Sequence, residues 1–367
     1  SFSLLIKPTS ADCNLRCAYC FYLEKSALYP AKPVHRMNSA TLKAMIGKCM
    51  SIGMEQTIFS WQGGEPLLMG LDFFREAVTL QATLGKKGQN VSNTIQTNGV
   101  LLKGDWLNFF NEFSFLVGLS IDGPQEIYDA NRFATGGRSV FKDVMDAVKL
   151  LQLFKTQFNV LTVISTANAT KAKDVYRFIK SLGVNFHQYI PAVRTPGQIS
   201  KGDNFSITGE EYGRFLLDLF EEWYPRDTRT VSIRLFDSII NVLVRGNPFY
   251  CEMGSSCSDY FVVEYNGDVY PCDFFVEPSH KLGNINSVSF EDLRSSEKYR
   301  KFSKLKMPQV DECRDCEFLS LCHGGCTRHR DYTTATSKAK TALCDGLKLF
   351  YKETLPTFKY LAQTVAN

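Results

Sequence analysis

Hydrophobic and polar positions along the first half of the chain alternate between two periods. Short runs rich in Val, Ile, Leu and Phe have the length and composition of buried strands, at residues 3–7, 56–62, 93–97, 115–121, 158–166 and 186–191. Amphipathic stretches with helical spacing lie between them, at residues 38–52, 71–84, 104–112, 140–154 and 172–182. This alternation predicts six strand–helix units with a parallel sheet and helices outside it.

The second half of the chain has a different pattern. Residues 195–208 are rich in Gly, Ser and Thr and predict a loop or a boundary, and residues 210–223 predict a helix. There the strand–helix rhythm stops; from about Cys251 the chain is rich in cysteines and turns, and a closing helix is predicted near residues 342–351. We therefore predict an α/β fold, with a partial (β/α)6 TIM-like barrel over residues 1–230 and a small Cys-rich domain with a C-terminal helix over residues 231–367. The active site is expected at the C-terminal ends of the barrel strands.

Composition narrows the class of protein. With 44% hydrophobic and 22% charged residues the chain reads as an ordinary globular protein, and no stretch approaches the roughly 20 apolar residues that span a bilayer. The first residues lack the order of a signal peptide, and a net charge of +4 without a long basic run does not favour a nucleic-acid partner. The twelve cysteines have the spacings of metal sites and not of a secreted disulfide framework, so we expect an anaerobic, reducing cytoplasm.

Three cysteines stand close together near the N-terminus. Cys13, Cys17 and Cys20 lie in CNLRCAYCFY with the spacing C-x3-C-x2-C. Three thiolates on one loop can hold three irons of a 4Fe-4S cluster and leave the fourth iron open to a small molecule. A zinc site is the alternative, but structural zinc takes four protein ligands and no neighbouring His supplies the fourth. The loop resembles the cluster loop of the radical S-adenosylmethionine enzymes, and this resemblance implies that Tyr19 contacts the cofactor S-adenosyl-L-methionine.

The next motif, QGGEP, follows the second predicted strand. Paired glycines let a backbone approach a ligand closely, and Glu65 or the neighbouring carbonyls can take an ammonium group. A strand-to-helix turn uses similar residues, so the motif alone is ambiguous. One unit after the cysteine loop, it resembles the superfamily motif that holds the amino group of S-adenosylmethionine, which implies cofactor contacts for Gly63, Gly64 and Glu65.

Three further positions depend on the resemblance. Ser120 ends the fourth predicted strand, and Arg132 follows it in DANRFA. Such residues are more often structural, but the resemblance implies that they contact the ribose and the carboxylate of the cofactor. Val193, where the family usually has Leu, is implied as a contact with the adenine.

Eight more cysteines form a second system. Cys257 and Cys272 enclose Gly267 in the pattern C-x9-G-x4-C, which predicts a hairpin that turns at Asn266-Gly267. Further on, the pattern C-x2-C-x5-C-x3-C resembles the SPASM extension, which carries auxiliary 4Fe-4S clusters, and eight thiolates suffice for two cubes. The resemblance assigns the cysteines to an inner cluster held by Cys251, Cys257, Cys272 and Cys326 and an outer cluster held by Cys313, Cys316, Cys322 and Cys344. With the N-terminal loop, three 4Fe-4S clusters are implied.

Zinc is the alternative for the second system too. C-x2-C pairs are common in zinc ribbons, and spacing does not exclude two zinc sites, but the N-terminal cluster loop favours iron–sulfur. The remaining cysteine, Cys49, lies on a predicted helix beside Met45 and Met50, where a buried structural thiol is expected.

Three segments narrow the resemblance further. CNLRCAYCFY with Tyr22, QGGEP with Gln62 and VYPCDFF with Asp273 are similar to the anaerobic sulfatase-maturating enzymes, and the similarity runs over nearly the whole chain. This implies that a 5′-deoxyadenosyl radical takes a hydrogen from Cβ of a Cys or Ser in a C/S-x-A-x-R sulfatase segment, which becomes Cα-formylglycine. Asp273 is the expected base, although a turn residue is the alternative, and Tyr22 and Gln62 either meet the substrate or pack. The expected partners are an extended or unfolded sulfatase segment and a reduced flavodoxin or ferredoxin-like electron donor.

Two other functions compete with this interpretation. Radical enzymes with the same cysteine extension form thioether or carbon–carbon crosslinks in ribosomal peptides, often with an N-terminal recognition domain, whereas only twelve residues precede Cys13 here. A zinc-ribbon binding module is the more distant alternative, and it leaves the N-terminal cysteines and the GGEP turn unexplained.

Overall fold

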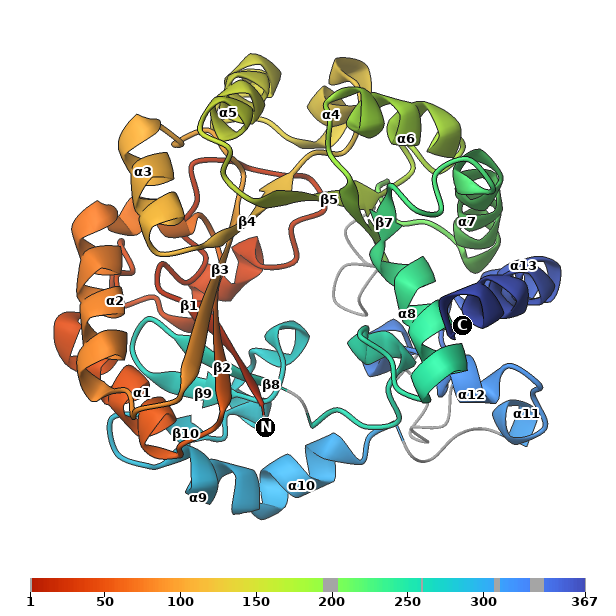
Figure 1. The fold of residues 1–367 in the computed structure, drawn as a ribbon. Coiled ribbons are helices and arrows are strands. Elements are labelled where there is room, and N and C mark those ends of the chain that lie inside the picture. The colour runs from red at the N-terminus through yellow and green to blue at the C-terminus, as the bar shows by residue number, and fades with distance from the viewer. Residues whose placement is uncertain (1, 194–203, 259, 307–310, 331–339, 367) are drawn as a thin grey trace. The chain divides into compact units, whose positions relative to one another are not determined.

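The computed structural model describes residues 2–193, 204–258, 260–306, 311–330 and 340–366 (Figure 1). The chain divides into two compact units, each built from segments that are far apart in the sequence. Unit 1 comprises Ser1–Ser120, Phe133–Phe158 and Cys257–Ser303. Unit 2 comprises Ile121–Arg132, Asn159–Ser256 and Lys304–Asn367. The domain boundary near residue 230 stays a prediction.

Unit 1 is built on one sheet with the strand order β10-β9-β8-β1-β2-β3-β4. Its parallel strands are β1 (Ser3–Lys7), β2 (Gln56–Trp61), β3 (Asn90–Thr97), β4 (Leu116–Ser120) and β8 (Tyr260–Glu264), while β9 (Asp268–Tyr270) and β10 (Gly283–Asn284) pair in antiparallel fashion. Helices α1 (Ser39–Ser51), α2 (Leu71–Leu84) and α3 (Gly104–Glu112) follow the strands in turn and lie along the outside of β1 to β4 (Figure 1). The carboxyl ends of β1, β2 and β8 therefore meet at one edge of the sheet.

Apolar packing holds these helices on the sheet of unit 1. α2 buries Phe73, Phe74, Ala77 and Val78 on one face, the spacing expected of a helix that covers a sheet. Phe74 packs edge-on against Trp61 of β2 at 5.4 Å between ring centroids. Because each buried aromatic side chain contributes roughly 1.5–3 kcal/mol, this face fixes α2 on the sheet. Unit 1 also contains α5 (Phe141–Leu153), α9 (Phe290–Ser295) and α10 (Glu297–Ser303).

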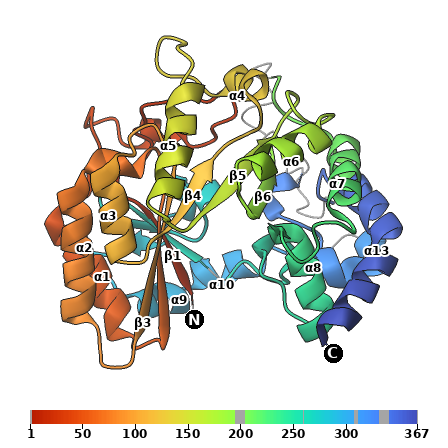
Figure 2. The ribbon, with the colours of Figure 1, turned by 45° about the horizontal axis from the view of Figure 1, so that its top comes forward.

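Unit 2 combines a second parallel sheet segment with several helices. Strands β5 (Phe158–Ile164), β6 (Phe186–Pro191) and β7 (Ser232–Ile233) are accompanied by α4 (Gln125–Asn131), α6 (Ala172–Ser181), α7 (Gly209–Trp223), α8 (Arg234–Arg245), α11 (Asp311–Arg314), α12 (Leu319–Cys322) and α13 (Cys344–Ala366). α13 lies beside α7 and α8 (Figure 2). A Cβ on Gly346 would fall 1.7 Å from the carbonyl oxygen of Gly209, so the first turn of α13 touches the backbone of α7 directly. This contact fixes where Cys344 begins α13.

The structure confirms the predicted α/β class and most of its elements. All six predicted strands and the helices between them are present with ends shifted by a few residues, and Gly267, at φ +87°, turns the β8–β9 hairpin as predicted. Two predictions were wrong: the strand–helix rhythm continues through β7 and α8, and the last helix runs on to Ala366, with Pro356 inside it. The short helix α4 was not predicted, and most of the predicted loop at 195–208 lies outside the described residues.

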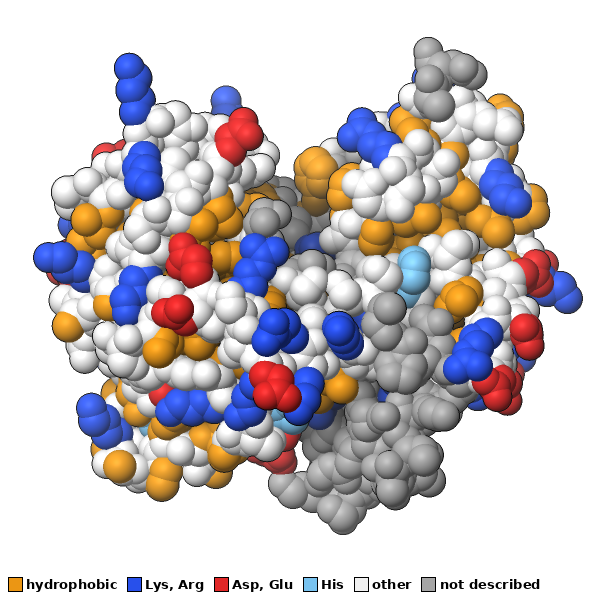
Figure 3. Space-filling view, turned by 90° about the horizontal axis from the view of Figure 1, so that it is seen from below, with side chains coloured by type: hydrophobic (Ala, Val, Ile, Leu, Met, Phe, Trp, Pro, Cys, Tyr) orange, Lys and Arg blue, Asp and Glu red, His pale blue; other side chains and the backbone are white. Residues whose placement is uncertain are grey.

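The surface is that of a charged globular protein. Basic and acidic side chains are interspersed on the face that Figure 3 shows. Within the described residues, no helix has both the length and the apolar character needed to span a membrane.

Candidate active site

The loop that carries Cys13, Cys17 and Cys20 leaves the carboxyl end of β1. Backbone hydrogen bonds shape it, from Ser10 N to Lys7 O at 3.0 Å and from Cys20 N to Cys17 O at 3.1 Å. All three thiols are partly buried, and none of the twelve cysteines of the chain forms a disulfide. The loop therefore presents three thiol groups over a short span, as a cluster with one open iron requires.

Asp12 anchors the residue before the first of these cysteines. Its carboxylate accepts hydrogen bonds from His35 N at 2.7 Å, from His35 Nδ1 at 2.9 Å and from Arg36 at 2.7 Å. Burial acts to raise the pKa of Asp12, but the hydrogen bonds from His35 and Arg36 outweigh it and hold that pKa below its usual value. Neither His35 nor Arg36 was identified from the sequence, because they lie more than 20 residues along the chain from Asp12.

Gly63 and Gly64 pack against the backbone of the cysteine loop. Gly64 N donates to Ser10 O at 2.7 Å, and Glu65 N donates to Asp12 O at 2.8 Å. A Cβ on Gly64 would lie 1.9 Å from Asp12 O, and Gly63 has φ +132°. Both glycines are thus required by the approach of two backbones, which is a different reason from the ligand contact expected from the sequence.

Glu65 is fully buried and ties the same turn to the end of β3. Its carboxylate accepts from Thr97 Oγ1 at 2.9 Å, from Asn98 N at 2.9 Å and from Leu67 N at 3.0 Å. Burial raises the pKa of Glu65 to about 7. A carboxylate held in this way is a positioning group, and the neighbouring backbone remains available to a cofactor.

Asn98 then links the end of β3 to the cysteine loop. Its Nδ2 donates to Asn14 Oδ1 at 2.8 Å and faces Cys13 Sγ at 3.7 Å. Leu15 N also donates to Cys13 Sγ, at 3.4 Å. Two N–H groups directed at one sulfur suit a thiolate ligand, whose negative charge they stabilise. The sequence signal for Asn98 was a polar residue directly after a buried strand.

The other predicted cofactor contacts are spread over both units. Ser120 is buried at the end of β4 in unit 1, and Tyr19 is half-buried in the cysteine loop. In unit 2, Val193 is half-buried, and Arg132 binds Asp122 through Nε at 2.9 Å and through a terminal nitrogen at 3.3 Å. Their shared role in holding a cofactor stays a prediction.

Asp273 lies in unit 1 beside a group of buried polar side chains. Its Oδ2 is 3.7 Å from Lys7 Nζ, and its Oδ1 is 3.6 Å from Cys272 Sγ. Tyr22 is buried, its hydroxyl donates to Glu264, and its ring lies 4.5 Å from Lys7 Nζ. Tyr22 is therefore a core residue in this structure, and its contact with a substrate stays a prediction.

Burial controls the electrostatics of this group. Burial lowers the pKa of Lys7, against the attraction of Asp273 and Glu264. It raises the pKa of Glu264 and, together with the nearby Glu264 carboxylate, that of Tyr22. Gln62, the other predicted substrate contact, is half-buried after β2, where its N donates to Ile6 O at 2.9 Å.

The cysteines predicted for the outer cluster line one cavity of unit 2. Its lining includes Cys313, Cys316, Cys322 and Cys344, from α11, the following turn, α12 and the start of α13. Within the described part of the chain, the only group of three ligand atoms within 4.8 Å of one another is Glu252, Cys326 and His329. Sulfur atoms on one tetrahedral zinc would stand about 3.8 Å apart, so these four cysteines fit a cluster better than a single ion.

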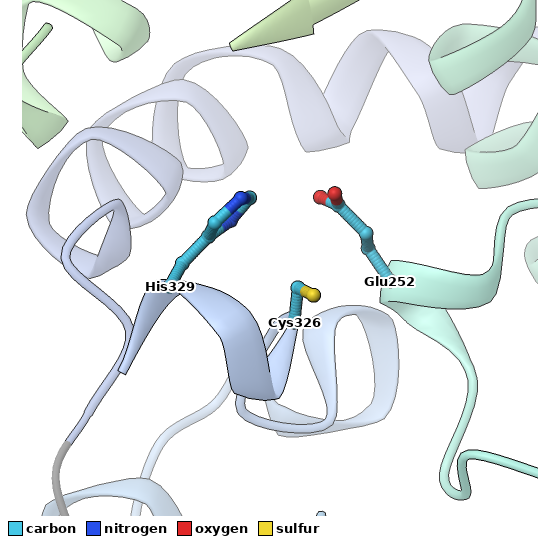
Figure 4. A group of neighbouring side chains, drawn as sticks. All are labelled: Glu252, Cys326 and His329. Atoms are coloured by element: carbon cyan, nitrogen blue, oxygen red, sulfur yellow. The ribbon is translucent and has the colours of Figure 1, made fainter. Parts of the chain in front are cut away.

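The cysteines predicted for the inner cluster belong to two units. Cys257 and Cys272 lie in unit 1, and Cys251 and Cys326 lie in unit 2. Glu252 and His329 extend toward one another beside Cys326 (Figure 4). Burial raises the pKa of Glu252 to about 7. The sequence analysis did not identify either group, because no motif marked them.

Comparison with known proteins agrees with this arrangement. Residues 8–179 match the radical SAM superfamily, and residues 251–317 match the SPASM iron–sulfur cluster-binding domain. The chain is thus a radical S-adenosylmethionine protein with a cluster-binding region after its strand–helix units. It is 34% identical to a cysteine-type anaerobic sulfatase-maturating enzyme of Clostridium novyi, over 100% of this chain and 98% of that one. It is 35% identical to a serine-type enzyme of Bacteroides thetaiotaomicron, over 99% and 92%.

A solved structure matches equally well. The structure described as native anSMEcpe with bound AdoMet and Cp18Cys peptide superimposes with a TM-score of 0.92 at 34% identity and covers 99% of both chains. The chain belongs to the anaerobic sulfatase-maturating enzymes.

Replacing Gly64 with Ala should break the contact between the two loops. The new methyl group would overlap Asp12 O, a backbone atom that cannot move without shifting the cysteine loop. We expect iron-free Gly64→Ala to lose about 2–3 kcal/mol of stability in chemical unfolding, and to take up less iron on reconstitution.

Gly47→Ala is the matched control. Gly47 lies inside α1, and a Cβ there would be 3.6 Å from the nearest atom, an ordinary contact. It should leave stability unchanged or raise it by up to about 1 kcal/mol. Equal stability and iron content in the two variants would contradict the proposed constraint.

Proposed function

We propose that this protein oxidises a Cys or Ser side chain within a C/S-x-A-x-R segment of a sulfatase to Cα-formylglycine. The observation that carries the proposal is the meeting, in unit 1, of the cysteine loop, the GGEP turn and Asp273 in a chain of this family. The relatives of both types are similar to the chain to nearly the same degree, so both Cys and Ser remain candidate targets.

The cofactors are S-adenosylmethionine and iron–sulfur clusters, for which we propose three 4Fe-4S cubes. Cys13, Cys17 and Cys20 would hold the first, which is supported by the donors to Cys13 Sγ. The outer cluster would be held by Cys313, Cys316, Cys322 and Cys344, which is supported by their shared cavity. For Cys251, Cys257, Cys272 and Cys326 the support is the resemblance in spacing.

The chain's own residues would orient the substrate and take up a proton. When bound, the clusters and S-adenosylmethionine supply a 5′-deoxyadenosyl radical, which takes a hydrogen atom from Cβ, and an acceptor for a second electron. Asp273 takes the remaining proton, from the thiol or the hydroxyl, so that a C=S or C=O bond forms. Its Oδ1 suits this task, since Cys272 as a cluster ligand would have no proton to share with it. A reduced flavodoxin or ferredoxin-like protein would supply the starting electron.

The first test uses reduced, reconstituted enzyme with S-adenosylmethionine and two short peptides, with C-x-A-x-R and S-x-A-x-R cores. Mass spectrometry should show a loss of about 18 Da from the Cys peptide or about 2 Da from the Ser peptide, with 5′-deoxyadenosine formed alongside. Cleavage of S-adenosylmethionine with both peptides unchanged would contradict the proposed substrate and favour a maturase that crosslinks ribosomal peptides.

Asp273→Asn removes the proposed base and keeps its shape. Because proton transfer by a positioned side chain contributes about 100-fold or more, the rate of formylglycine formation should fall by at least that factor. Cleavage of S-adenosylmethionine should change far less, since the radical forms before the proton moves. An unchanged formylglycine yield would remove Asp273 from the reaction.

The number of clusters is tested by iron analysis. Three cubes give about twelve irons per chain, and replacing Cys313 and Cys316 together with Ala should lower this to about eight. Cys49→Ala is the control, because Cys49 is buried in α1 and has no place in either cysteine system. Roughly four irons with bound zinc in the unaltered protein would reassign the C-terminal cysteines to zinc sites.

A further inference from the structure

Two buried charged residues of unit 1 have no part in the chemistry so far. Lys7 is 2% exposed and Glu264 is fully buried. They end the neighbouring parallel strands β1 and β8 and are register partners there. A buried charge is unfavourable unless it is paired, so both residues need a reason to stand at this edge of the sheet.

The surroundings of Lys7 fix the direction of its side chain. A Cβ on Gly63 would come within 3.3 Å of Lys7 Cδ, so the glycine leaves room for the lysine stem. At the far end the ammonium lies 4.5 Å from the centre of the Tyr22 ring, a favourable cation–π distance. The Tyr22 hydroxyl donates to Glu264, which holds the ring in place. The ammonium is thus held between the glycine turn and a fixed aromatic face.

Asp273 stands at the open end of this arrangement. The carboxylate is 20% exposed, whereas the lysine beside it is 2% exposed. Its Oδ2 faces Lys7 Nζ at 3.7 Å, and its Oδ1 is directed elsewhere, toward Cys272 Sγ. The two oxygens therefore have different surroundings: one faces a buried cation and the other lies on the side that solvent and substrate reach.

We propose that Lys7 is a positioning residue for the oxidation, and that it holds Asp273 with Oδ1 turned toward the proton of the substrate thiol or hydroxyl. Glu264 and Tyr22 in turn hold Lys7. This role rests on the proposed function, in which Asp273 takes that proton. The hydrogen atom taken from Cβ does not involve Lys7, so the lysine should act on the second half of the reaction only.

The test is Lys7→Met, which keeps an unbranched side chain and removes the charge. It uses reconstituted enzyme and a target peptide deuterated at Cβ. We expect deuterium to reach 5′-deoxyadenosine at a rate within about threefold of the unaltered enzyme, and the formylglycine formed per 5′-deoxyadenosine to fall about tenfold. Lys7→Arg, which restores a cation, should recover part of that ratio.

Lys48→Met is the matched control. Lys48 is a partly buried lysine of unit 1 whose ammonium donates to the carbonyls of Ile285 and Val288 at 2.6 and 2.9 Å. Its replacement should lower thermal stability and leave the product ratio unchanged. Iron content and the cluster spectrum, measured on every variant, show whether a loss of activity reflects loss of clusters.

Each outcome decides between the claims. A ratio in Lys7→Met equal to that of the unaltered enzyme, or equal losses of deuterium transfer and formylglycine, would overturn the role of Lys7 and leave the proposed function intact. Loss of clusters in both Lys7→Met and Lys7→Arg would show that Lys7 is structural and also overturn it. If the unaltered enzyme oxidises neither peptide, the proposed function fails first, and the role of Lys7 fails with it.

Discussion

The contact between the backbones of two loops is the constraint on which the site depends. β1 and β2 are parallel neighbours, so the loops after them leave the sheet at the same edge. There Gly64 N and Glu65 N donate to the carbonyls of Ser10 and Asp12, at a separation that leaves no room for a side chain on Gly64. The loop with the cysteines and the loop expected to hold the cofactor amino group are therefore one rigid piece. A cofactor that binds to an iron and to a protein loop together needs that rigidity, because small displacements of reacting groups have large effects on rate.

A second connection reinforces this piece from the side. Glu65 is buried, and three hydrogen bonds offset the cost of its burial. Two of them come from Thr97 and Asn98 at the end of β3, and Asn98 continues to Asn14 and Cys13. The strand ends β1, β2 and β3 are thereby tied together through polar groups above an apolar sheet. Such a network is stable only when every member is satisfied, which makes it sensitive to single substitutions.

The sequence predicted the elements whose signals are local and failed where the signal is distant or short. The strands of the sheet were found because their apolar runs are continuous, but β7 has only two residues and α4 only seven, too few to show a period. α13 passes beyond its predicted end because its contacts with α7 and α8 hold a helix that contains Pro356. The cysteines and glycines were found because fixed spacings mark them. Lys7, Glu264, Asn98 and His35 were missed, since their partners are distant in the chain: Tyr22 and Glu264 are 242 residues apart.

The position of Lys7 also follows from the charges around it. Cys20 and Cys272 are both near enough to interact with its ammonium, and as metal ligands they would be anionic. Asp273 adds a further negative charge in the same region, and like charges close together disfavour one another. A lysine that ends a buried strand supplies a fixed positive charge there at the cost of its own desolvation, which lowers its pKa. A cation of this kind both compensates the surrounding anions and turns one carboxylate oxygen inward. Compensation acts whenever the protein is folded, whereas orientation matters only when a proton moves, and so the two effects of one side chain are separable in the products of the reaction.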